Sequence, residues 1–183
     1  MPPRRSGATV ASALVLAVVL AAMVWPAEAP AACLATPACL EVTFPPDFAW
    51  GQLDPGPAGN ESAEQMVAVT SNELWGLRVA SDLADGRMTE WTGGAYVVST
   101  PKILSHPLRW SLSSIDTVGQ PPAYQAMSSA PGSVLSGQPS TCPGACASAQ
   151  IGVRYRQPIS FTDVPAGANT YRIQVTYDAA QGF

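Results

Sequence analysis

Apolar and polar residues alternate with a period of two over most of the chain after residue 40. Trp75, Leu77 and Val79 follow this rule, as do Ile151 and Val153. In a strand, alternate side chains point to opposite faces, so we expect half-buried strands. Proline and glycine clusters separate the segments, and we see no helix longer than two turns after residue 31. The sequence predicts an all-β fold after an N-terminal signal helix: an antiparallel β-sandwich of the Ig-like or Greek-key type, with a barrel as the lesser alternative.

The predicted strands are unequal in length and in clarity of pattern. A short first strand is expected at 41–44, with pairing that could continue over 48–53. Further strands are expected at 65–70, 74–81, 108–112, 151–156 and 171–177, and short ones near 124–127 and 133–135. The segment 88–92 is less clear, and 54–60 is predicted to be a turn. The strands 151–156 and 171–177 are the clearest, and we expect them to form a pair connected by a loop over 162–170.

The first thirty residues have the order of an export signal. Arg4 and Arg5 form a basic head, residues 8–25 are an uninterrupted apolar run, and residues 26–32 are mostly small. We therefore predict a secretory signal peptide at 1–31 and a single β-sandwich domain at 32–183. An uncleaved membrane anchor is the alternative, because about 18 apolar residues can just span a bilayer.

The charge balance limits the partners of the exported part. Seven of the nine lysines and arginines and twelve of the thirteen acids follow residue 31, and they form no basic stripe. This argues against nucleic-acid binding and against adhesion to anionic lipid. After signal cleavage we expect no membrane span.

Four cysteines lie in the exported part, at positions 33, 39, 142 and 146. An even number in an oxidising compartment indicates two disulfides. Proximity in sequence favours Cys33–Cys39 and Cys142–Cys146, and the two crossed pairings remain open. A zinc site is disfavoured, because the spacings are wrong and the single histidine is remote in sequence. We expect no metal and no cofactor.

Residues capable of catalysis are few. His106 is flanked by Pro107 and lies far in sequence from any nucleophile motif, so we interpret it as an exposed loop histidine. The close carboxylate sets, Glu61 with Glu64 and Asp82 with Asp85, lie in or beside turns. The alternative is a small secreted hydrolase, in which Asp82 or Glu61 faces Trp91 across a cleft and one carboxyl has a raised pKa. We predict that the chain is not an enzyme.

Tryptophans offer a further candidate for binding. Trp75 and Trp110 share strand faces with aliphatic residues, which predicts core positions. Trp91 lies beside Gly93 and Gly94 in a predicted loop, so it is the better candidate for an exposed aromatic. Two exposed aromatics on one sheet face would instead indicate carbohydrate binding.

Two segments together resemble a known family. The first, 72–79, contains the step Trp75-Gly76-Leu77, and the second, 171–177, begins and ends with tyrosine. They resemble the WxL surface-protein family of Gram-positive bacteria, in which an early Trp-x-Leu is paired with a distal strand led by tyrosine. Where the family has a second Trp-x-Leu, this chain has Tyr177-Asp178-Ala179. The resemblance assigns binding roles to five residues: Trp75, Leu77, Tyr171, Val175 and Tyr177.

The resemblance implies an exported, non-catalytic surface protein that associates non-covalently with cell-wall peptidoglycan or with another surface protein. We therefore expect a secreted or cell-surface location. The alternatives are a carbohydrate-binding module, a pilin-like module that assembles through exposed strand edges, and the small hydrolase.

Overall fold

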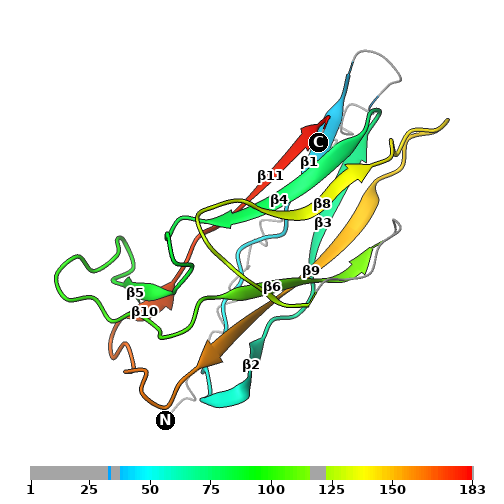
Figure 1. Cartoon of the computed structure of the whole chain (residues 1–183). Helices are drawn as coiled ribbons and strands as arrows, with labels where there is room; N and C mark the ends of the chain where they lie inside the picture. Colours follow the sequence, from blue (N-terminus) through cyan, green and yellow to red (C-terminus); the bar gives the residue numbers. More distant parts are fainter. Residues whose placement is uncertain (1–32, 34–37, 116–122, 183) are drawn as a thin grey trace, which may run out of the picture. The chain divides into compact units, whose positions relative to one another are not determined.

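The structure is a computed structural model. The part of the chain that it describes contains eleven strands and no helix (Figure 1). That part is residue 33 and residues 38–115 and 123–182; the predicted signal peptide lies outside it. No helix capable of crossing a membrane occurs among these residues. The strands are β1 (Leu40–Thr43), β2 (Gly56–Glu61), β3 (Gln65–Ser71), β4 (Trp75–Ser81), β5 (Thr89–Trp91), β6 (Arg109–Ile115), β7 (Gln125–Ala126), β8 (Gly132–Gln138), β9 (Ala149–Ile159), β10 (Thr170–Arg172) and β11 (Val175–Gln181).

The strands form three antiparallel sheets. The largest has the order β1-β3-β9-β6-β7, with β2 also paired to β9. A second sheet has the order β11-β4-β8, and a third contains only β10 and β5. The eleven-residue β9 is central to the large sheet, because it pairs with β3 and β2 as well as with β6.

One hydrophobic core joins the two larger sheets. Strand β4 contributes Trp75 and Leu77, and β6 and β9 contribute Trp110, Ile151 and Val153, all at most 1% exposed. The fold is therefore an all-β sandwich, as the alternating pattern predicted. The core positions predicted for Trp75 and Trp110 are confirmed. The indole N–H of Trp75 donates to the Pro139 carbonyl at 3.0 Å, so its polar atom is satisfied inside the core.

The segment predicted to be a turn at 54–60 contains strand β2, so that prediction was wrong. The Asn60 side chain explains the difference. Its amide oxygen accepts the Asp54 N–H at 2.9 Å, and its amide nitrogen donates to the carbonyls of Asp54 and Gln157. These bonds hold an irregular strand against β9, where the register shifts between Gly56 and Asn60. The neighbouring segment 48–53 forms no strand.

The segment predicted as one strand at 171–177 is divided between two sheets. Strand β10 pairs with β5 and β11 pairs with β4, so the expected pairing with 151–156 was wrong. Asp82 holds the chain at the division point. Its carboxylate accepts the Gln174 N–H at 2.9 Å, and its own N–H donates to the Gln174 carbonyl at 3.0 Å. The period-two pattern continues through such a junction, so the sequence alone does not reveal it.

Candidate functional site

Both disulfides have the local pairing that proximity favoured. Cys33 is bonded to Cys39, with 5.5 Å between their Cα atoms, and Cys142 is bonded to Cys146, with 3.9 Å between theirs. The Cys146 sulfur lies 2.7 Å from the Cys33 carbonyl oxygen, so the two bridges are neighbours in space. Two disulfides are typical of a domain that works in an oxidising, extracytoplasmic compartment.

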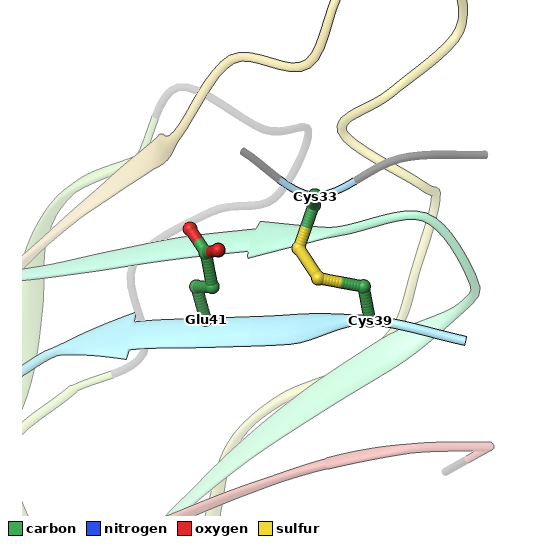
Figure 2. Close-up of side chains that lie close together, drawn as sticks. All are labelled: Cys33, Cys39 and Glu41. Carbon is green, nitrogen blue, oxygen red and sulfur yellow. A yellow bond between two sulfur atoms is a disulfide. The ribbon is translucent and has the colours of Figure 1, made fainter. Parts of the chain in front are cut away.

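A carboxylate lies beside the first disulfide. Figure 2 shows Glu41 on β1 near Cys33 and Cys39, and the three potential ligand atoms are within 4.8 Å of one another. The two sulfurs are bonded to each other, so neither is a thiolate that could bind a metal. In the oxidised protein this group offers a cation one carboxylate only.

The residues singled out by the family resemblance lie mainly in the core. Trp75 and Leu77 are 0% exposed, and their side chains reach no surface. Val175 and Tyr177 are half-buried on β11, which pairs with β4. Tyr171 lies in the small sheet, where its hydroxyl donates to the Val164 carbonyl at 2.5 Å. The structure thus places four of the five residues, all except Tyr171, in one sheet. Because Trp75 and Leu77 are buried, they could affect binding only by stabilising the fold.

Tyr177 joins the two larger sheets through a hydroxyl–hydroxyl hydrogen bond with Tyr155 on β9. Phe44 stacks on Tyr177 with the ring centroids 5.8 Å apart, and Phe48 stacks on Tyr155 at 5.5 Å. Burial raises the pKa of both tyrosines, that of Tyr177 to about 12. The sequence indicated Tyr177 but not these ring contacts, because Phe44 and Phe48 lie between β1 and β2, where no strand register predicts their neighbours.

Trp91 is half-buried rather than fully exposed. The Arg172 guanidinium lies 4.6 Å from the centre of its ring, and Tyr96 meets it edge-on at 5.0 Å. The Tyr96 hydroxyl donates to Asp82 at 2.7 Å. An aromatic ring covered by an arginine offers less area to a sugar than the open platform that carbohydrate stacking requires.

The carboxylates that the hydrolase alternative requires, Asp82 and Glu61, are engaged in hydrogen bonds. Both Asp82 oxygens accept hydrogen bonds, from the Gln174 N–H and from the Tyr96 hydroxyl. A hydrogen bond from Tyr124 and the charges of Arg156 and Arg154 lower the pKa of Glu61. A general acid needs the opposite shift. Glu61 therefore lacks the raised pKa that this alternative predicted.

A polar cluster on the outside of the large sheet was missed from the sequence. It consists of Glu61, Tyr124, Arg154 and Arg156, and we call it the outer-face array. The two arginines point outward because the residue between them on β9, Tyr155, is buried.

The contacts within the outer-face array are specific. The Tyr124 hydroxyl donates to Glu61 at 2.5 Å, and the Arg156 guanidinium lies 4.4 Å from the centre of the Tyr124 ring. Glu61 also forms ion pairs with Arg156 at 3.5 Å and Arg154 at 3.8 Å. An aromatic ring, two guanidinium groups and a carboxylate on one exposed surface can bind hydroxyls, amides and carboxylates.

A cavity of about 360 Å³ opens beside this array, and its lining includes His106, Arg109 and Arg156. Arg109 on β6 is directly opposite Arg156 on β9. His106 is exposed, as predicted, but it lies beside two arginines rather than alone. Only the register of β6 against β9 reveals this grouping, since the arginines are far apart in sequence.

No protein-family model, curated protein or solved structure matches this chain.

Proposed function

We propose that this is an exported, non-catalytic binding protein that associates non-covalently with the cell wall through the outer face of its large sheet. The observation that carries the proposal is the outer-face array, in which Arg156 stacks on Tyr124 and shares Glu61 with Arg154. The side chains of the array already hold one another in place through these contacts. Binding a ligand would therefore cost little additional side-chain entropy.

The chemistry of peptidoglycan fits such a surface. This polymer presents sugar hydroxyls, acetamido groups, peptide amides and carboxylates. Guanidinium groups bind carboxylates and amide oxygens, and a tyrosine ring packs against the apolar face of a sugar. The export-signal pattern and the two disulfides support a secreted or cell-surface location.

Replacement of Tyr124 by alanine is expected to weaken retention on purified, insoluble peptidoglycan by roughly fivefold to tenfold, because both the cation–π contact and the Glu61 hydrogen bond are lost. The measurement is a pull-down of the exported, oxidised protein over a range of wall concentrations, with cellulose and chitin as control polymers.

Phenylalanine variants make this test specific. Tyr124→Phe keeps the ring beneath Arg156 and should retain most of the affinity, and Tyr96→Phe removes a hydroxyl at a different site and should change nothing. Retention equal to the wild type in Tyr124→Ala would rule out the outer face as the wall-binding surface. If none of the three polymers retained the wild-type protein, the proposed function itself would be wrong.

One observation favours a second candidate, a pilin-like assembly module. Among the described strands, β8 and β11 pair only with β4, so each has one unpaired edge. Unpaired edges accept a strand from another chain. Under this candidate, light scattering would show an increase in mass with protein concentration, and a constant monomer mass would eliminate it.

A further inference from the structure

The cavity beside the outer-face array has a concentration of positive charge that the fold itself does not neutralise. Arg109 and Arg156 are directly opposite each other on neighbouring strands, an arrangement of like charges that destabilises a sheet. Glu61 pairs with Arg156 at 3.5 Å. Within the described residues, Arg109 has no ion-pair partner.

A second observation points to a missing partner at the same place. The Nε atom of Arg156 is buried and, among the described residues, has no hydrogen-bond partner. A buried donor without a partner is costly, and native structures seldom retain one without a ligand or water to satisfy it. The protein as a whole carries a net charge of −4, so the excess of positive charge in this cavity is local.

Part of the remaining lining is apolar, and it lies beside the polar side chains of His106 and Ser160. Pro158, Ile159 and Phe161 line the same cavity, and Phe161 is 88% exposed. An exposed phenylalanine beside two arginines offers a small apolar group a surface next to an anion site. The ligand that fits this lining is an anion carried on a short apolar stem.

Hydrogen bonds fix the framework of the cavity. Gln157 is fully buried, and its amide nitrogen donates to the carbonyls of His106 and Pro158 at 3.1 and 2.9 Å. Asp163 accepts the N–H groups of Ser105 and Ser160, each at 2.8 Å, and so ties together the two loops at the rim. A cavity held in this way is preorganised for a ligand.

We propose that this cavity binds the terminal carboxylate of a short peptide, with Arg109 and Arg156 on the carboxylate and Ile159 and Phe161 against the adjoining methyl group. The charge favours a monoanion, because Glu61 already pairs with Arg156, whereas Arg109 has no ion-pair partner among the described residues. This inference rests on the proposed function, because peptidoglycan stems that end in D-alanine carry such a carboxylate and such a methyl group.

The test is a calorimetric titration of the exported, oxidised protein with acetyl-D-alanyl-D-alanine. Two other probes accompany it: the C-terminal amide of the same peptide, which lacks the charge, and inorganic phosphate. Wild-type protein should bind the carboxylate peptide at least tenfold more tightly than the amide. Arg109→Gln should weaken binding of the carboxylate peptide by about tenfold or more, since a charge-assisted hydrogen bond is lost.

Arg172→Gln is the matched control, because Arg172 is on β10 in the small sheet, where it stacks on Trp91, and does not line the cavity. It should bind the peptide within about twofold of the wild type. Equal affinity for peptide and amide, or an Arg109→Gln variant that binds like the wild type, would overturn the proposal. Binding of phosphate that depends on Arg109, without binding of the peptide, would also overturn it.

The two proposals fail in different ways. If peptidoglycan retains the protein and the dipeptide does not bind, the carboxylate site is wrong and the wall-binding function stands. If the dipeptide binds and peptidoglycan does not retain the protein, the site stands and the wall-binding function is wrong.

Discussion

Replacing Trp75 by alanine is expected to lower the free energy of unfolding by about 3–5 kcal/mol. The Trp75 side chain is 0% exposed, lies in the core between the sheets and donates a hydrogen bond to Pro139. The substitution would leave a large cavity and an unpaired carbonyl. Single domains have a total stability of about 5–15 kcal/mol, so this loss removes a large fraction of the stability. Chemical denaturation followed by circular dichroism measures the loss.

Leu74 provides a matched control one residue away. It is 56% exposed, and Leu74→Ala should change the free energy of unfolding by no more than about 0.5 kcal/mol. A Trp75→Ala variant with wild-type stability and lost wall binding would show that Trp75 is a contact residue, as the family resemblance implied, and would contradict its position in the core.

Raising the pH from 10 to 12 is expected to destabilise the protein steeply. Burial raises the pKa of Tyr177 to about 12 and raises that of its partner Tyr155 as well. In the unfolded chain both would titrate near 10. The stability from these raised values is therefore fully present below pH 10 and is lost as the pH rises toward the folded pKa. For Tyr177 the loss is roughly 2–3 kcal/mol by pH 12.

The measurement is denaturant unfolding at a series of pH values from 8 to 12, with the disulfides verified as intact at each. The double variant Tyr155→Phe and Tyr177→Phe should show a clearly shallower dependence on pH. Some dependence will remain, because the pKa values of Tyr96, Tyr124 and Tyr171 are also raised. An equal slope in the double variant would show that the buried tyrosine pair does not control alkaline stability.

The sequence predicted the strands well because each strand of a sandwich buries one face. The alternation of apolar residues at Trp75, Leu77 and Val79 matches the buried face of β4. The pairing of the strands was harder to predict from the sequence. The assignment of β10 and β11 to different sheets depends on hydrogen bonds between Asp82 and Gln174, ninety-two positions apart. No local pattern encodes such a contact.

The candidate site was harder to predict than the fold. The family resemblance indicated buried residues such as Trp75, whereas the polar cluster on the outer face passed unnoticed. Arginine and glutamate on the exposed side of a strand have the same pattern in a solvated face and in a binding face. The register that places Arg109 opposite Arg156 brings their charges together, and neither segment shows this by itself. The disulfide pairing was predictable, since the partners are separated by only six and four positions.

The most direct test of the central claim is to map where soluble peptidoglycan fragments contact the isotopically labelled, oxidised protein by NMR. We predict that added disaccharide-peptides shift the backbone signals of β2, of residues 154–156 on β9 and of residues 123–126. The signals of β4 and β8 in the opposite sheet should stay unchanged. Signal shifts confined to the opposite sheet, or no shifts at millimolar concentrations of the fragments, would contradict the assignment of the outer face as the wall-binding surface.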